Sequence, residues 1–498
     1  MSDAHVRLRA THEHPSGAAW ARPGGPWHVP ALDVALAATS DDQLVGPVAA
    51  GLQQLGVGAG DTVAWQRPND HDAVSLYRAC WRLGAIAAPI HHRAGRADVT
   101  ALLDLLDPRD PRLVLGPDDP VPRGTPPVRP GESDVPAGSL AVALATSGST
   151  GTPKVVLHTH RALVYKARLM ARVHELGEDD HVLMPAPLAH ISGLLNGILV
   201  PGVSGMRVTL MDRWEPALAL DIIDREQVTF MVGPPAFFVS LIDAQGRERW
   251  RTRSLRLVSC GGAGVTPTFV ERASAELGCR VKRTYGSTEA PSVTSWTAGD
   301  APARARDTDG RPVGAAELRV VRVTPPQPGS VGNASADVGE VGEVGEVQVR
   351  GPELFVGYSD PAATHAAFTA DGWFRTGDLG RVDTEGWLTI VGRTGDVVIR
   401  GGENIAASEV ATVLEAHPAV RQAVVVGVAD ERLGERVGVV MVPAGPALTL
   451  PQCREWFAAR GITRFKWPEV LVAVDELPLL PSGKPDRTAL LSMLHPRS

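Results

Sequence analysis

The length, composition and charge of the chain exclude several classes of protein. Its 498 residues exceed what one compact core usually needs, and 44% apolar with 21% charged residues is the balance of a globular protein rather than a disordered one. The net charge of −7 shows none of the basic excess that is typical of nucleic-acid-binding proteins. The four cysteines include no CxxC pair, which fits a reducing compartment and argues against a structural zinc site.

No hydrophobic segment of the sequence has the length of a membrane span or the pattern of a signal peptide. Residues 1–17 lack an apolar core, and no apolar stretch reaches the roughly 18 residues that a bilayer requires. We therefore expect a cytoplasmic, multidomain α/β protein without a nucleic-acid partner.

The chain first alternates helical and strand patterns. Apolar residues three and four positions apart predict a helix over 44–55, and a glycine-rich turn leads to a predicted strand over 62–66. A second helical pattern over 73–83 ends at a glycine and precedes an apolar run over 85–90. This alternation is typical of a wound α/β domain.

Further short apolar runs predict buried strands, and helical patterns separate several of them. The predicted strands are 140–145, 182–184, 229–232, 255–259, 280–284 and 346–350, and the predicted helices are 217–225 and 269–277. Between residues 325 and 347 the chain is rich in Pro and Gly and repeats Val-Gly-Glu. These units are too few for a solenoid, and we expect a surface loop.

After Asp396 the pattern starts again and predicts a second domain. A strand over 397–400, a helix over 408–415 and strands over 423–428 and 437–442 are enough for an α+β unit of about 100 residues. We expect a large N-terminal α/β domain of several subdomains, residues 1–394, and a small C-terminal α+β domain, residues 395–498, with the boundary near residues 392–396.

The segment TSGSTGTPK, from Thr146 to Lys154, has the composition of a phosphate-binding loop. Glycines bring backbone N–H groups close to phosphate oxygens, hydroxyl groups add donors, and a lysine adds positive charge. It is not the Walker sequence, because Pro153 stands where the second glycine belongs and Val155 replaces the Ser/Thr. Composition alone also fits an ordinary loop, but the position after a buried strand favours phosphate binding.

Five segments, read together, resemble the adenylate-forming superfamily of acyl- and aryl-CoA synthetases, luciferases and nonribosomal adenylation domains. They are TSGSTGTPK, YGSTE at 285–289, GWFRTGD at 372–378, GR at 392–393 with Asp396 and GGENI at 401–405, and PSGK at 481–484 with Arg487. They occur in the order and spacing of the family, and weaker similarity runs from Leu44 to Leu490. The resemblance implies the adenylate-forming fold with a mobile small domain, and ATP, Mg²⁺ and coenzyme A as cofactors.

The resemblance also implies roles for individual residues. The predicted ATP- and AMP-binding residues are Thr146, Ser147, Gly148, Ser149, Thr150, Gly151, Thr152, Lys154, Gly262, Ala263, Tyr285, Gly286, Ser287, Thr288, Asp378, Arg393 and Lys484. Thr150 and Lys154 are expected at the β- and γ-phosphates, and Glu289 with Thr150 at Mg²⁺, a hard cation that prefers oxygen ligands. The remaining expectations place Asp378 and Arg393 at the ribose and Tyr285 on the adenine, beside a flat wall of residues 261–264.

Lys484 is the predicted catalyst of adenylation, and Glu289, Thr150 and His190 complete the predicted catalytic set. A flexible point charge can reach both the carboxylate and the α-phosphate as negative charge develops. The resemblance implies that the small domain then rotates, withdraws Lys484 and opens a CoA channel, for which we expect Gly401, Gly402 and Glu403.

The predicted hinge departs from the family pattern. Relatives usually have Asp or Lys two residues after the arginine of this stretch, and this chain has Gly395. Glycine tolerates large φ/ψ changes, so rotation itself is preserved, whereas the polar contact that would hold either orientation is missing. We expect Gly395→Pro to slow the second half-reaction more than the first.

The resemblance to acyl-CoA synthetases implies that His190, in Pro187-Leu-Ala-His190-Ile-Ser-Gly193, lies at the acyl pocket, where we also expect Gly261, Gly262 and Gly264. No carboxylate in 187–193 is available to hold a substrate ammonium group, which favours an acid without an α-amino group. The alternative is a packed or capping histidine. His91-His92 and His158-Thr-His160 lack the partners of a metal site, and we interpret them as turn and helix-start residues.

These features predict an ATP-dependent carboxylic acid:CoA ligase. Two alternatives stay open: an enzyme that loads the phosphopantetheine of a carrier protein, and a nucleotide-binding relative without turnover. Retention of Glu289, Asp378, Arg393 and Lys484 speaks against the second alternative. The sequence leaves the acid open among medium-chain, alicyclic and aryl acids, and it leaves the oligomeric state open, a homodimer included.

Overall fold

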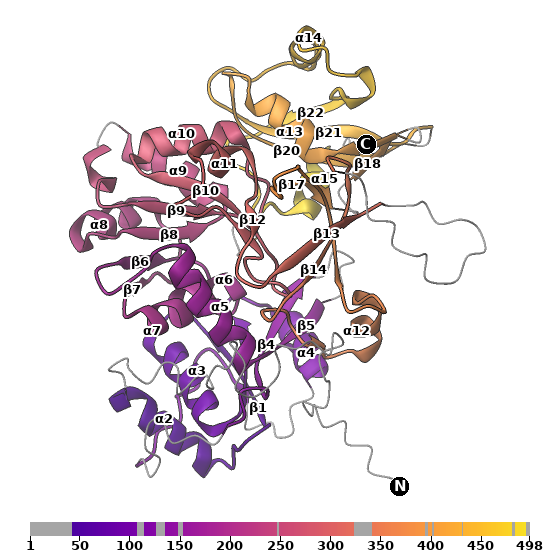
Figure 1. The fold of residues 1–498 in the computed structure, drawn as a ribbon. Coiled ribbons are helices and arrows are strands. Elements are labelled where there is room, and N and C mark those ends of the chain that lie inside the picture. The colour runs from indigo at the N-terminus through magenta and orange to yellow at the C-terminus, as the bar shows by residue number, and fades with distance from the viewer. Residues whose placement is uncertain are drawn as a thin grey trace.

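The computed structural model places most of the chain in four β-sheets with flanking helices (Figure 1). It describes residues 42–106, 114–125, 135–147, 153–246, 249–322, 341–393, 397–400, 403–430, 432–480 and 484–494. Most of the predicted loop at 325–347 and the hinge position at 395 therefore lie outside the described residues.

The first sheet has the strand order β15-β5-β4-β2-β1-β3. Its strands are β1 (Thr62–Arg67), β2 (Ile86–His91), β3 (Val114–Leu115), β4 (Leu140–Ser147), β5 (Pro153–Thr159) and β15 (Gly357–Tyr358), and its helices are α2 (Asp42–Gln54), α3 (His71–Leu83), α4 (Arg96–Leu106) and α5 (His160–Val173). The predicted alternation of helices and strands over residues 44–90 is confirmed.

Local sequence explains where α3 begins and ends. The carboxylate of Asp70 accepts from the N–H of Ala73 at 2.7 Å and caps the first turn, and Gly84, with φ of +71°, ends the helix in the left-handed conformation. The buried face carries Trp81, whose indole N–H donates to the carbonyl of Ala141 on β4. Packing of this face fixes α3 against the sheet.

Strand β5 corrects two of the sequence predictions. The segment up to Lys154 was expected to be loop, but residues from Pro153 on pair antiparallel with β4, with Lys154 opposite Thr146. His158 was expected in a turn, and it lies fully buried in β5. The run Val155–Leu157 is short and ends in polar residues, so its strand character depends on the partner β4. His160 does begin α5, as predicted.

The second sheet has the order β12-β11-β10-β9-β8-β6-β7. Its strands are β6 (His181–Met184), β7 (Arg207–Leu210), β8 (Phe230–Gly233), β9 (Leu257–Cys260), β10 (Arg280–Tyr285), β11 (Thr294–Ser295) and β12 (Arg311–Pro312). Between them lie α6 (Ile191–Leu194), a π-helix (Leu195–Leu199), α7 (Val200–Ser204), α8 (Pro216–Glu226), α9 (Pro235–Gln245), a 3₁₀ turn (Arg249–Thr252), α10 (Pro267–Leu277) and α11 (Pro302–Asp307).

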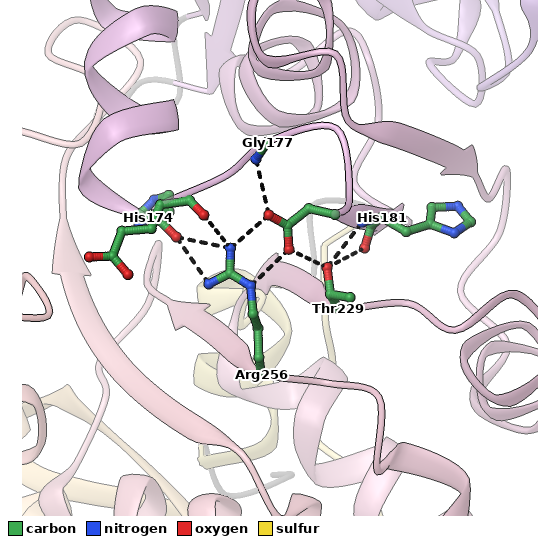
Figure 2. A network of polar contacts seen from close by, with 7 residues as sticks. His174, Gly177, His181, Thr229 and Arg256 are labelled. Atoms are coloured by element: carbon green, nitrogen blue, oxygen red, sulfur yellow. Dashed lines mark hydrogen bonds and ion pairs between the residues drawn. The ribbon is translucent and has the colours of Figure 1, made fainter.

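Strands β6, β8, β9 and β10 are parallel, so their carboxyl ends share one edge of the sheet. A polar network closes the opposite, amino edge (Figure 2). The guanidinium of Arg256 donates to both carboxylate oxygens of Asp180 at 2.8 and 2.9 Å and to the carbonyls of His174 and Glu175. The hydroxyl of Thr229 donates to the same carboxylate at 2.7 Å. This network joins the starts of β6, β8 and β9 and leaves the carboxyl edge for the site.

The third sheet packs beside the first two and has the order β13-β14-β16-β17. Its strands are β13 (Glu317–Val321), β14 (Gly345–Arg350), β16 (Phe374–Val382) and β17 (Leu388–Arg393), with α12 (Pro361–Ala367) before β16. Phe355 stands at the centre of its core and contacts the rings of Tyr358, Phe368 and Phe374.

The C-terminal elements form the fourth sheet, of five strands. They are β18 (Val397–Arg400), β19 (Glu403–Ala406), α13 (Ala407–Glu415), β20 (Val420–Asp430), β21 (Gly434–Pro443), α14 (Leu450–Ala459), a 3₁₀ turn (Arg464–Lys466), β22 (Val470–Ala473) and α15 (Arg487–Leu494). Figure 1 shows them at one end of the molecule, where α13 contacts α10 and β17. Within the described ranges, no helix combines the length and the apolar character needed to cross a bilayer.

Candidate active site

The carboxyl edge of the second sheet carries three groups of the predicted site residues. His190 follows β6, residues 261–264 follow β9, and residues 286–289 follow β10 directly. Loops at this edge of a parallel sheet lie next to one another and are the usual place for ligands in α/β folds. The structure therefore brings together side chains that are up to 100 residues apart in sequence.

Gly261 and Gly262 have different structural reasons to be glycine. A Cβ at Gly261 would lie 2.6 Å from the carbonyl oxygen of Thr284, so the close approach of β9 to β10 excludes a side chain. Gly262 has φ of +78°, which favours glycine whatever the space around it. A Cβ at Gly264 meets nothing within 4 Å, so nothing in the backbone requires glycine there.

Asp378 joins two neighbouring residues of the predicted nucleotide site. Its Oδ2 accepts from the hydroxyl of Tyr285 at 2.7 Å, and its Oδ1 accepts from Nε of Arg393 at 2.6 Å. Asp378 is only 4% exposed and lies opposite Arg393 in the β16–β17 pair. Burial and the neighbouring carboxylate raise the pKa of Tyr285, and the same carboxylate raises the pKa of Arg393. The hydroxyl of Tyr285 thus contacts Asp378, and stacking of the Tyr285 ring on adenine stays a prediction.

Glu289 is held by contacts that sequence reasoning did not find. The hydroxyl of Tyr358 donates to its Oε1 at 2.9 Å, and the N–H of Phe355 donates to its carbonyl at 2.9 Å. Nε2 of His158 donates to the carbonyl of the preceding residue, Thr288, at 2.7 Å. Tyr358 lies in a Gly-Tyr pair that follows no periodic pattern, so nothing in the sequence marked it.

The residues around Glu289 fit a magnesium ion shared with phosphate oxygens. Oε2 of Glu289 has no hydrogen-bond partner among the described residues, so a carboxylate oxygen is available as a hard ligand. The described ranges contain no group of three or more His, Cys, Asp or Glu residues that could hold a metal without the nucleotide. One carboxylate plus phosphate oxygens is the usual donor set for Mg²⁺ in such sites.

Lys484 lies inside this site although it comes from the C-terminal elements. Its Cε is 3.6 Å from the position that a Cβ would take on Gly262. The residue is exposed as a whole, but burial of its ammonium group and the charge of Arg393 lower its pKa, while the carboxylates of Asp378 and Glu289 act in the opposite direction. These electrostatic partners place the ammonium group among the predicted nucleotide-binding residues.

His190 stands at the start of α6 and faces the same region. Its side chain makes no capping hydrogen bond, which contradicts the alternative of a capping histidine. Its ring centroid lies 6.0 Å from that of His91, and burial, with His91 and Lys484 nearby, lowers its pKa to about 4. The imidazole is therefore neutral at physiological pH and lies within electrostatic reach of Lys484.

The phosphate-binding segment is described only at its ends. Thr146 is the second-last residue of β4 and lies opposite Lys154, and its hydroxyl donates to the carbonyl of Lys154 at 3.5 Å. Several predicted residues lie outside the described part of the chain: Gly148, Ser149, Thr150, Gly151, Thr152, Gly395, Gly401 and Gly402. For Ser147 and Glu403 only the backbone is described, in β4 and β19. Their roles stay predictions.

Comparison with known families gives two matches that together span most of the chain. The family model described as AMP-binding enzyme matches residues 42–109 and 107–359, and the model of the AMP-binding enzyme C-terminal domain matches residues 409–484. The medium-chain fatty-acid–CoA ligase of Escherichia coli strain K12 is 30% identical over 470 residues, which cover 86% of this chain and 80% of that protein.

Two solved structures share the arrangement of the chain. ATP-bound MatB from Rhodopseudomonas palustris superposes with a TM-score of 0.79 at 26% identity, covering 92% of each chain. The O-succinylbenzoate coenzyme A synthetase of Bacillus subtilis, in complex with ATP and magnesium ion, superposes with a TM-score of 0.72 at 27% identity, covering 90% of this chain and 93% of the other.

Proposed function

The chain belongs to the family of AMP-binding enzymes and is an adenylate-forming ligase, and on that premise we propose that it joins a carboxylic acid to the thiol of coenzyme A. The observation that carries the proposal is the position of Lys484. A lysine of the C-terminal elements lies against Gly262, within electrostatic reach of Asp378, Arg393 and His190. A single ammonium group can thus serve both the nucleotide and the acid.

In the first half-reaction a carboxylate oxygen of the acid attacks the α-phosphorus of ATP. The bond from that phosphorus to the bridging oxygen breaks, and pyrophosphate leaves with the electron pair. Both reactants are anions, so the protein must align them and neutralise charge rather than supply a nucleophile. Lys484 would stabilise the charge that develops between carboxylate and phosphate, and Asp378 and Arg393 would hold the ribose.

Mg²⁺, held by Glu289 and the phosphate oxygens, would neutralise charge on the triphosphate when bound. Lys154 would add a second positive charge at the phosphate end of the site. One neighbour is a complex with ATP and magnesium ion, which supports the use of both by this chain.

In the second half-reaction the thiol of coenzyme A loses its proton, and its sulfur attacks the acyl carbonyl carbon. The carbon–oxygen bond to the phosphate breaks and AMP leaves. We place Lys484 outside the site at this stage, after rotation of the small domain about Gly395, with Gly401, Gly402 and Glu403 along the thiol channel. Lack of a side chain at Gly402 would let a pantetheine arm pass close to the backbone.

The acid proposed is one without an α-amino group. The described segment 187–193 contains no carboxylate to pair with an ammonium group, and the neutral ring of His190 occupies that place. The Escherichia coli relative is named for medium-chain fatty acids and the Bacillus subtilis neighbour for O-succinylbenzoate, which supports acyl or aryl acids.

The test is a pyrophosphate-release screen over medium-chain, alicyclic and aryl acids, with and without coenzyme A, followed by detection of acyl-CoA. We expect release that depends on the acid and a thioester that appears only with coenzyme A. If pyrophosphate is released but the acyl group is transferred only to the phosphopantetheine of a carrier protein, the acceptor is that carrier protein and not coenzyme A. Failure of every acid to release pyrophosphate would overturn the proposal.

A further inference from the structure

We infer that Tyr358 is a positioning residue that keeps the carboxylate of Glu289 and the ammonium of Lys154 apart and correctly placed for a nucleoside triphosphate with its divalent cation. The inference rests on the proposed function. It concerns a residue that lies in neither the phosphate-binding segment nor the YGSTE segment.

The two functional groups contact different parts of one side chain. The hydroxyl of Tyr358 donates to Oε1 of Glu289 at 2.9 Å, and Nζ of Lys154 lies over the ring, 4.9 Å from its centroid. An ammonium over an aromatic face is attracted by the ring quadrupole, and a hydroxyl that donates to a carboxylate makes a charge-assisted hydrogen bond. Tyr358 therefore holds a cation and an anion at the same time.

The tyrosine itself is fixed by its surroundings. It is 8% exposed, and its ring packs edge-on against Phe355 with centroids 4.9 Å apart. Its backbone pairs with Val156 of β5, two residues after Lys154. The N–H of Phe355 in turn donates to the carbonyl of Glu289. The segment that carries the ring is thus hydrogen-bonded to both segments that carry the two charges.

This arrangement prevents the two charges from neutralising each other. Lys154 and Glu289 make no ion pair with each other, and both belong to the described residues. Opposite charges this close to a shared partner attract, and a direct pair would withdraw the carboxylate from a cation and the ammonium from phosphate oxygens. A rigid aromatic ring between them leaves Oε2 of Glu289 available to the cation and Lys154 available to the phosphates.

Two substitutions separate the two contacts. Tyr358→Phe keeps the ring under Lys154 and removes the hydroxyl from Glu289, whereas Tyr358→Leu removes both. Binding of ATP over a range of Mg²⁺ concentrations, and binding of AMP without metal, would be measured by calorimetry in the absence of acid. We expect Tyr358→Phe to raise the Mg²⁺ concentration for half-maximal ATP binding by about tenfold, the scale of one hydrogen bond to a charged group. AMP binding should not change, because AMP lacks the β- and γ-phosphates.

Tyr358→Leu should weaken ATP binding further, including binding measured with EDTA, because Lys154 then loses its place. The matched control is Tyr77→Phe, which removes another buried tyrosine hydroxyl hydrogen bond, to the carbonyl of Leu188 at 2.7 Å. We expect the control to leave the Mg²⁺ dependence unchanged. In the Glu289→Gln background, Tyr358→Phe should have no additional effect on the Mg²⁺ dependence, since it acts through that carboxylate.

The outcomes distinguish the inference from the function on which it rests. A wild-type chain that binds ATP with a clear Mg²⁺ dependence, together with an unchanged Tyr358→Phe variant, overturns the inference alone. Equal loss of AMP and ATP binding in Tyr358→Phe would show a general structural role and also overturn it. A wild-type chain whose ATP binding does not respond to Mg²⁺ overturns both.

Discussion

The hydroxyl of Thr266, at the start of α10, donates a 2.7 Å hydrogen bond to Oε2 of Glu415, at the end of α13. The two residues are 149 positions apart, and they join the large N-terminal part of the chain to the C-terminal elements that carry Lys484. A second link of this kind is the hydroxyl of Ser408, which donates to the carbonyl of Val391. Any rotation that withdraws Lys484 must break such contacts.

Thr266→Val should favour the second half-reaction relative to the first. Loss of one hydrogen bond of about 1 kcal/mol shifts the balance between docked and rotated orientations by about fivefold. The measurement is the ratio of single-turnover rates for adenylate formation and thioester formation. Thr266→Ser keeps the hydroxyl and serves as the control, because Thr266 also caps α10 through the N–H of Phe269. A ratio that stays the same in both variants would exclude this contact as a latch.

Burial of the Glu415 carboxyl predicts a pH dependence of stability. Burial raises the pKa of Glu415, while the N–H of Ala423, the hydroxyl of Thr266 and the charge of Arg272 act in the opposite direction. A carboxyl group with a raised pKa stabilises the folded chain below its ordinary pKa, and this contribution is lost as pH rises through the raised value.

We therefore expect the free energy of unfolding to fall as pH rises through that window, and Glu415→Gln to remove this part of the profile. Other carboxyl groups titrate in the same range, so chemical denaturation compares the unfolding free energies of wild type and Glu415→Gln at each pH. Parallel profiles for the two proteins would contradict the prediction.

Lys484→Ala should slow adenylation by about 30- to 1000-fold, which corresponds to about 2–4 kcal/mol of the barrier for a lost preorganised charge. Acid-dependent pyrophosphate release measures the effect. Lys466→Ala is the matched control, because Lys466 also belongs to the C-terminal elements but pairs with Glu409 at 2.7 Å. Pyrophosphate release at the wild-type rate in Lys484→Ala would remove the lysine from the proposed mechanism.

The sequence predicts well where the strands of the second sheet lie and which edge of that sheet carries the motifs, because both follow from local patterns. Buried parallel strands such as 257–260 are short apolar runs, and the motif that follows each strand must lie at its carboxyl end. The positions of Gly261, Tyr285 and Glu289 near one another could therefore be expected before the structure was known.

Contacts between distant segments could not be predicted in the same way. The Tyr358–Glu289 hydrogen bond joins residues 69 positions apart, and the Thr266–Glu415 contact joins two domains, so no local periodicity reports either of them. Strand β5 was missed because its apolar core is only three residues long and its pairing with β4 decides the conformation. Of the alternative of a packed or capping histidine at position 190, only capping through the side chain is contradicted, because no such hydrogen bond forms there.

Tyr285→Phe should weaken the binding of AMP and ATP alike, whereas Tyr358→Phe should change only the Mg²⁺-dependent binding of ATP. It removes the hydroxyl that donates to Asp378 at 2.7 Å, and we propose that Asp378 binds the ribose, which AMP and ATP share. We expect both nucleotides to bind about tenfold more weakly, the scale of one hydrogen bond to a charged group, with an unchanged Mg²⁺ dependence. Calorimetric titration with AMP and with ATP plus Mg²⁺ measures this. Loss of ATP binding alone would show that Asp378 does not hold the ribose.

Lys282 gives a prediction about stability rather than catalysis. Its side chain is 1% exposed on β10, Nζ donates to the carbonyl of Trp296 at 2.8 Å, and burial lowers its pKa to about 7. Between pH 7 and 10 the unfolded chain therefore carries a proton that the folded chain lacks, because an unperturbed lysine has a pKa near 10.4. Stability contributed by this group rises with pH in that range and is lost as pH falls through about 7.

Lys282→Met should remove this pH dependence while keeping a side chain of similar length. We expect the unfolding free energy of wild type relative to Lys282→Met to rise by about 1 kcal/mol between pH 7.5 and about 8.5, somewhat below the limiting slope of one full proton. Comparison with the variant is needed because burial raises the pKa of the cysteine thiols, among them Cys260 and Cys279, and these groups act in the opposite direction. Chemical denaturation at several pH values measures the difference, with the partly exposed Lys466, changed to Met, as the control. Stability curves that run parallel for wild type and Lys282→Met would mean that Lys282 keeps its proton in the folded chain.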